Sequence, residues 1–107
     1  MVHSLQSRQE FWEQDSKVEQ FASREPDVRM VSLLKTFAQP SSVRVLDLGC
    51  AGGRNAAYLA AEGFQVLATD FSEAMVTRTR ERLTEYLGSE GAAQCCWQAP
   101  MWDLETV

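Results

Sequence analysis

Two aspartates and the glycine-rich turn between them are the residues whose types and spacing could do chemistry. Asp47 closes an apolar run and is followed by the letters LGCAGGRN, and Asp70 closes the next apolar run. Glycines let the main chain turn sharply and let a ligand approach its atoms without a Cβ in the way. Acids and glycines at the ends of consecutive buried strands are typical of a binding site for a nucleotide-like ligand in a doubly wound sheet.

The first acid indicates which kind of nucleotide would fit. A dinucleotide-binding turn reads G-x-G-x-x-G, so that a pyrophosphate can sit on the N-terminus of the following helix. Here Ala51 takes the second glycine position and Arg54 takes the third. A carboxylate at Asp47 would repel a pyrophosphate, whereas it suits a ligand that carries an ammonium and a sulfonium group. Half of a nicotinamide dehydrogenase is therefore the least favoured interpretation.

The run LDLGCAGGRNAAYLAAEGFQVLATDFS resembles the class I S-adenosylmethionine-dependent methyltransferases. Asp47, Gly49 and Gly53 match the first motif of that family, and Ala51 replaces its middle glycine. The elements Gly-Arg-Asn, Tyr-Leu-Ala and Gly-Phe-x-Val look most like the tellurite-resistance type of small methyltransferase. The resemblance covers residues 43–104. It implies S-adenosylmethionine as the cofactor and a small molecule as the methyl acceptor.

The resemblance also implies roles for individual residues. Asp47 would act near the ammonium group of the cofactor, while the glycine turn would approach its methionine moiety with main-chain atoms. Asp70 has two acceptor oxygens for the two ribose hydroxyls, and Phe71 could pack on the adenine. Arg54 is either a partner of the cofactor carboxylate or a surface arginine. The residues expected at the cofactor are Asp47, Gly49, Cys50, Ala51, Gly53, Arg54, Asp70, Phe71, Met75, Pro100 and Met101.

The third strand departs from the family pattern. Many members continue this strand with a Gly-Asp pair whose aspartate accepts a hydrogen bond from the adenine amino group. In this sequence Ala99 and Pro100 stand at those two positions. The adenine amino group would therefore need another acceptor. The catalytic residues cannot be named from the sequence.

Alternating strands and helices must position these residues. The segments expected to be strands are 43–48, 64–69 and 94–98, and those expected to be helices are 53–62 and 72–88. Gly63 is expected to cap the first of these helices, Ser72 to begin the second, and residues 88–93 to form a loop. Right-handed crossovers then give a parallel sheet in the order 3-2-1.

Residues 1–41 are expected to form an N-terminal helical cap, and residues 42–107 a partial S-adenosylmethionine-binding domain. Within the cap, one helix is expected over 8–22 and a second after Asp27. Some members of the family that the sequence resembles carry such a cap over the cofactor. Trp12 is either a lid residue or an aromatic side chain that packs the cap onto the sheet.

Composition limits the classes of function. A chain of 107 residues forms one domain, and its net charge of -5 argues against a nucleic-acid partner. The polar opening residues and the lack of a long apolar run argue against a leader or a membrane span, so the cytoplasm is expected. Cys50, Cys95 and Cys96 lack metal-ligand spacing, so no metal site is expected and the cysteines are interpreted as reduced, small apolar residues.

The expected fold class is α/β: a Rossmann-like, three-layer half-domain, truncated relative to the seven-stranded family fold. Only the strands numbered 3, 2 and 1 in that family are found, so the part that usually faces the acceptor is missing. Strand 1 then becomes a sheet edge, which can pair with another chain. Three interpretations stay open: a fragment of a longer enzyme, a half-domain that dimerises through strand 1, and a cofactor-binding module without chemistry.

Overall fold

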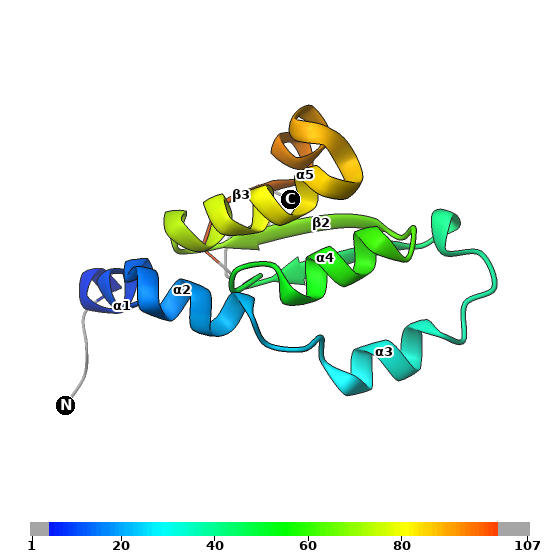
Figure 1. Ribbon diagram of the computed structural model, residues 1–107, viewed down its shortest axis with the longest axis horizontal. Coiled ribbons are helices and arrows are strands. Elements are labelled where there is room, and N and C mark those ends of the chain that lie inside the picture. The colour runs from blue at the N-terminus through cyan, green and yellow to red at the C-terminus, as the bar shows by residue number, and fades with distance from the viewer. Residues whose placement is uncertain (1–4, 101–107) are drawn as a thin grey trace.

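A three-stranded parallel sheet is at the centre of the computed structural model, which describes residues 5–100, with side chains from residue 9 onward (Figure 1). The strand order is β1-β2-β3, and each strand pairs with its neighbour in parallel. The α/β class, the Rossmann-like arrangement and the expected 3-2-1 order are therefore confirmed. The strands are β1 (Arg44–Leu48), β2 (Gln65–Asp70) and β3 (Cys96–Gln98).

Helices α4 (Arg54–Ala61) and α5 (Glu73–Cys95) cover one face of the sheet. Side chains alternate between the two faces of a strand, so Val45 of β1 packs against the core that these helices form. Leu46 and Leu48 point to the opposite face and are 42% and 39% exposed. The core under α4 and α5 includes Leu59, Ala60, Phe64, Val66, Ala68, Val76, Leu83 and Cys96.

The predicted helix caps are confirmed, whereas one predicted loop is wrong. Gly63 follows α4 with φ 90°, and the Ser72 hydroxyl accepts a hydrogen bond from the Met75 amide at 3.2 Å. Gly88 has a non-helical conformation (φ 76°, ψ 166°) that bends α5, and the helix resumes after it, so residues 89–93 are helical and α5 continues to Cys95. Burial of Ala92 against the core outweighs the weak helix propensity of the glycines there. Strand β3 is accordingly shorter than expected.

The N-terminal segment forms helices α1 (Leu5–Glu13), α2 (Asp15–Ala22) and α3 (Val28–Leu34), and a short 3-10 turn, η1 (Pro40–Ser42). The single helix expected over 8–22 is therefore wrong. Gln14 has an extended conformation (φ −68°, ψ 128°) that separates α1 from α2. The predicted start of α3 is confirmed, since the Asp27 carboxylate accepts hydrogen bonds from the first free amides of that helix.

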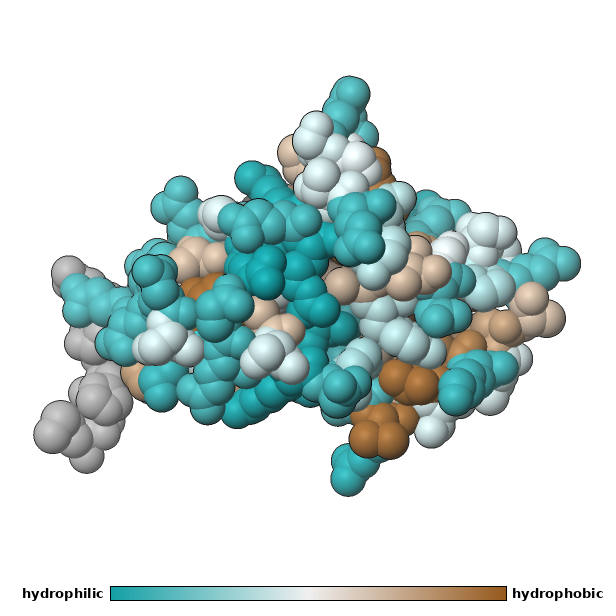
Figure 2. Space-filling view, viewed as in Figure 1, coloured by the Kyte–Doolittle hydropathy of each residue, from teal (hydrophilic) through white to brown (hydrophobic). Residues whose placement is uncertain are grey.

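Helices α1 and α2 lie beside α5, at the end of the sheet where the strands terminate (Figure 1). The Ser72 hydroxyl donates to the Trp12 carbonyl at 3.1 Å, and the Arg82 guanidinium donates to the Ala22 carbonyl at 2.5 Å. The surface over α1 and α2 is mostly hydrophilic, whereas apolar residues gather over α3 (Figure 2).

The division into residues 1–41 and 42–107 stays a prediction. Among the described helices, none has the length and apolar character needed to cross a membrane.

Candidate functional site

The turn after β1 is built from main-chain conformations that favour glycine. Positive φ angles occur at Gly49 (74°), Ala51 (49°), Gly52 (82°) and Gly53 (94°). A Cβ on Gly52 would lie 2.8 Å from the Cβ of Ala22, so α2 sits directly on this turn. The absence of side chains here serves two purposes: it allows the left-handed conformations, and it brings the N-terminal helices onto the turn.

The carboxylate of Asp70 joins the turn after β1 to the start of α5. One oxygen, Oδ2, accepts a hydrogen bond from the Ala51 amide at 3.0 Å, and the other, Oδ1, accepts one from the Ser72 amide at 2.9 Å. Burial raises the pKa of Asp70, while the hydrogen bonds from these amides oppose that rise. Each carboxylate oxygen can accept more than one hydrogen bond. The group is therefore held in one orientation and still has capacity for ribose hydroxyls.

The carboxylate of Asp47 is in the opposite situation. Its Oδ2 atom is buried and has no hydrogen-bond partner among the described residues. Burial, and then the charge of Asp70, raise the pKa of Asp47 to about 6, whereas the nearby Arg54 acts to lower it. A buried carboxylate without a donor is unfavourable. Asp47 is therefore suited to a ligand that brings a positively charged donor to the end of β1.

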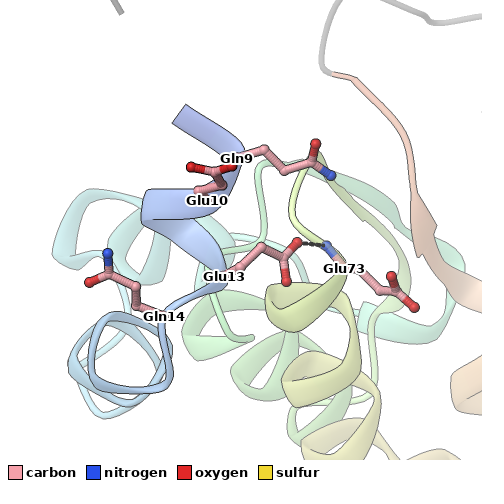
Figure 3. Close-up of a pocket in the computed structure, with 5 residues that line it drawn as sticks. All are labelled: Gln9, Glu10, Glu13, Gln14 and Glu73. Atoms are coloured by element: carbon pink, nitrogen blue, oxygen red, sulfur yellow. Dashed lines mark hydrogen bonds between the residues drawn. The ribbon is translucent and has the colours of Figure 1, made fainter. Parts of the chain in front are cut away.

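Sequence reasoning missed Glu13, which binds the N-terminus of α5. Its two carboxylate oxygens accept hydrogen bonds from the amides of Glu73 at 2.7 Å and Ala74 at 2.9 Å. Figure 3 shows this carboxylate pointing at α5 from the end of α1. No local pattern could have found this cap, because it joins residues about sixty positions apart.

Two of the expected site residues have their side chains in the interior. Cys50 is 2% exposed, and its sulfur lies 3.1 Å from the Thr79 hydroxyl. A hydrogen bond with Cys96, together with burial, raises the pKa of the Cys50 thiol. Met75 belongs to the first turn of α5 and is 1% exposed. Neither the Cys50 nor the Met75 side chain is therefore exposed to a ligand.

Arg54 joins the start of α4 to the segment between α2 and α3. Its Nη1 atom donates to the Glu25 carbonyl at 3.0 Å. The neighbouring Asn55 side chain accepts a hydrogen bond from the Asp27 amide at 2.9 Å. The Arg-Asn pair after the glycine turn therefore fixes the N-terminal segment, and the contact between Arg54 and a cofactor carboxylate stays a prediction.

The turn after β3 returns to the second acid. The Ala99 amide donates to the Asp70 carbonyl at 2.9 Å, and the Gln98 side chain donates to the Phe71 carbonyl at 3.0 Å. Pro100, which is half-buried, comes directly after this contact. Met101 lies outside the described residues. The ends of β2 and β3 are thus brought together, as an adenine-binding edge would require.

Trp12 packs within the N-terminal helices. Its ring lies edge-to-face against Phe11 and Phe21, with centroid distances of 4.8 Å and 5.0 Å. Both ring partners belong to the N-terminal helices, so the lid role and the packing of the cap onto the sheet both stay predictions for Trp12. Its main-chain carbonyl is the group that contacts Ser72.

A model of the methyltransferase-domain family matches residues 45–100, which is just over half of the chain. The matched segment contains Asp47, the glycine turn and Asp70. The chain therefore belongs to this family, and the domain is a class I S-adenosylmethionine-dependent methyltransferase domain. The match does not single out the tellurite-resistance type. No curated protein and no solved structure gave a match to the chain.

Proposed function

We propose that this chain binds S-adenosylmethionine at the carboxyl ends of β1 and β2, as the cofactor-binding part of a methyltransferase. The observation that carries the proposal is the buried, unpartnered Oδ2 atom of Asp47. The cofactor ammonium group would give this oxygen a charged donor, and charge-assisted hydrogen bonds are the stronger kind. When bound, the cofactor supplies the electrophilic methyl group, and the protein aligns that group with an acceptor.

The second acid supports the same ligand. Asp70 is 9% exposed, and two amides hold its carboxylate in place before any ligand binds. Preorganised acceptors lose little conformational entropy on binding, which favours recognition of two adjacent hydroxyls. Phe71 and Pro100 flank this position and would line the adenine side of the site.

A small molecule is the acceptor class that we propose, of the kind used by the tellurite-resistance type that the sequence resembles. The net charge of -5 supports this choice over a nucleic acid, whose phosphates would be repelled. Cys50, Cys95 and Cys96 are all free thiols. Free thiols are usual in a reducing compartment, which supports a cytoplasmic location.

The experiment is calorimetric titration of the chain with S-adenosylhomocysteine. We expect Asp70→Ala to weaken binding by about 1–3 kcal/mol, because ribose hydrogen bonds are lost. Asp70→Asn keeps one carbonyl acceptor, so it separates the loss of ribose hydrogen bonds from a general disruption of the turn. Glu85→Ala removes an exposed acid of α5 and is the matched control. Unchanged affinity in both Asp70 variants would contradict the ribose assignment.

The acidity of Asp47 gives the titration a second readout. Its pKa of about 6 means that this carboxylate is protonated in the free protein at lower pH. A cationic ligand prefers the ionised form, so the affinity of the wild type should decrease as the pH falls below about 6. An affinity that is independent of pH across this range would contradict the role of Asp47.

A dimerising, non-catalytic module is the second candidate function. It is favoured by the edge of β1, where Leu46 and Leu48 are 42% and 39% exposed and β2 is the only described strand that pairs with β1. Sedimentation velocity of the wild type and of Leu46→Lys tests this candidate. The candidate would be supported if the wild type is a dimer, if Leu46→Lys dissociates that dimer, and if Leu33→Lys on α3 leaves it intact. A monomeric wild type would exclude it.

A further inference from the structure

The N-terminus of α5 lies beside the acid that we assign to the ribose. The Asp70 carboxylate accepts a hydrogen bond from the amide of Ser72, and Ser72 is the residue that caps α5. The carboxylate is therefore in direct contact with the residue at the start of the helix. The first amides of a helix have no partner within it and attract anions. In Rossmann-type sites a phosphate on the ribose is bound close to the residue that follows the second strand. The free amides of this helix terminus would therefore be the nearest backbone donors for such a phosphate.

In this protein the first amides of α5 are already engaged. The Glu73 and Ala74 amides donate to the two oxygens of Glu13, at 2.7 Å and 2.9 Å, and the Met75 amide donates to the Ser72 hydroxyl at 3.2 Å. The group that occupies the terminus is itself an anion. A phosphate would have to displace the Glu13 carboxylate before it could reach these donors.

The surface in front of the terminus is also acidic. A hollow of about 480 Å³ opens there, and its lining contains no basic side chain (Figure 3). The residues that line it are Gln9, Glu10, Glu13, Gln14 and Glu73. In the adjoining hollow, which shares Glu13 and Glu73, Arg78 is the only basic lining residue and is bonded to Glu19 at 2.8 Å. The side chains that line these two hollows carry more negative than positive charge, which opposes the approach of a phosphate.

Glu13 and Asp70 are close enough to influence each other electrostatically. Burial is the main cause that raises the pKa of Asp70, and the charge of Glu13 adds to the rise. A phosphate ester on the ribose would place a further negative charge near both carboxylates. Repulsion from two fixed carboxylates would therefore oppose it, in addition to the loss of free helix amides.

We propose that Glu13 is a specificity-determining residue, which restricts the site to cofactors whose ribose carries no phosphate. This inference rests on the proposed function, because it needs the ribose at Asp70. The N-terminal helix α1 then takes part in ligand selection, because its Glu13 carboxylate occupies the N-terminal amides of α5. The hydrogen bond from the Ser72 hydroxyl to the Trp12 carbonyl fixes the end of α1 beside α5.

The test measures how well adenosine and adenosine 2′-monophosphate displace S-adenosylhomocysteine. The wild type should prefer adenosine by about tenfold or more, because the phosphate finds a filled helix terminus. Glu13→Ala opens the amides of Glu73 and Ala74 and should lower this preference to about twofold or reverse it. Glu13→Gln removes the charge and keeps a carbonyl acceptor, so its preference should lie between the two.

The matched control is Glu19→Gln, which removes a charge from α2 and weakens its contact with Arg78 while leaving α5 capped. It should keep the wild-type preference, which would show that neither net charge nor looser docking of the helices explains the change. Circular dichroism checks the folding of each variant, and Glu13→Gln decides the question if Glu13→Ala does not fold.

The outcomes separate this inference from the function on which it rests. A wild type that does not bind S-adenosylhomocysteine overturns both. A wild type that binds it, together with a preference for adenosine that is unchanged in Glu13→Gln and in folded Glu13→Ala, overturns the inference alone. A preference that falls in the Glu13 variants and not in Glu19→Gln supports it.

Discussion

The turns after β1 and β2 lie side by side, yet they are stabilised in opposite ways. The turn after β1 depends on left-handed backbone conformations and on close contact with α2, and the acid before it, Asp47, has an oxygen without a partner. The turn after β2 depends on hydrogen bonds, since Asp70, Ser72 and Glu13 satisfy one amide after another.

The difference assigns separate tasks to the two turns. The second turn is complete in the free protein, so it can present a fixed carboxylate to a neutral, hydroxyl-bearing group. The first turn is incomplete, because the buried Oδ2 atom of Asp47 has no hydrogen-bond partner among the described residues, and a cationic donor would satisfy it. A ligand with hydroxyls at one end and a positive charge at the other would satisfy both, and this is the polarity of S-adenosylmethionine.

The largest expected effect breaks the packing of the first turn. Gly52→Ala places a Cβ 2.8 Å from the Cβ of Ala22 at a residue with φ 82°. Backbone strain and steric overlap together should lower the free energy of unfolding by about 3 kcal/mol or more. Urea denaturation measures the change.

Gly63→Ala is the matched control for Gly52→Ala. Its φ is 90°, but its Cβ would meet only Pro40, at 4.0 Å. It should cost about 1 kcal/mol, which reports the strain alone. Adding Ala22→Gly to Gly52→Ala should recover part of the loss, since the nearest atom is removed. Equal losses in the two single alanine variants would show that contact with α2 is not what restricts Gly52.

An intermediate effect sharpens the electrostatic difference. The pKa of Asp47 is about 6 in the folded protein, which is above the ordinary value of an aspartate. At a pH between the ordinary value and about 6, the folded state therefore keeps a proton that the unfolded state has released. Ionisation of Asp47 therefore lowers stability as the pH rises toward about 6. Asp47→Asn should be more stable than the wild type by about 2–3 kcal/mol above this pH, with the difference disappearing below about pH 4.

Urea denaturation across the pH range, without ligand, measures this difference between Asp47→Asn and the wild type. A difference that does not change with pH would mean that Asp47 has an ordinary acidity. The same variant should bind S-adenosylhomocysteine more weakly, so stability and affinity should move in opposite directions.

The smallest expected effect concerns the one residue other than glycine that has a positive φ among those described. Ala51 has φ 49°, a conformation that costs a residue with a side chain about 1 kcal/mol. Ala51→Gly should therefore raise the free energy of unfolding by up to about 1 kcal/mol, although a more flexible unfolded chain offsets part of the gain. Ala61→Gly, at the end of α4, should change stability in the opposite direction. A loss of stability in Ala51→Gly would contradict the strain at this turn.

The sequence was sufficient to predict the parts of the fold that depend on local signals. Apolar runs predicted the strands, Ser72 and Asp27 predicted two helix starts, and Gly63 predicted a helix end. The break at Gln14 and the helix after Gly88 were missed, because both depend on packing against distant residues: the contacts that α1 and α2 make with α5, and the burial of Ala92.

The same distinction applies to the site. Asp47, the glycine turn and Asp70 were found because acid and glycine follow each strand directly in the sequence. The sequence gives no sign that Asp70 is hydrogen-bonded and that Asp47 is not, because that depends on where the Ala51 and Ser72 amides point. Glu13 was missed for the same reason, since its partners are known only once α1 is placed against α5.

The cap on α5 also bears on the order in which the chain acquires its structure. Glu13 and its partner amides are about sixty positions apart, and α1 and α2 have only nine and eight residues. Isolated helices of that length are marginal in water. During synthesis α1 and α2 emerge before α5, so the contacts that they make with α5 cannot form until α5 has been made. Pulse-labelling hydrogen exchange during refolding should therefore show late protection of α1: a segment that is made before α5 becomes fixed only after it.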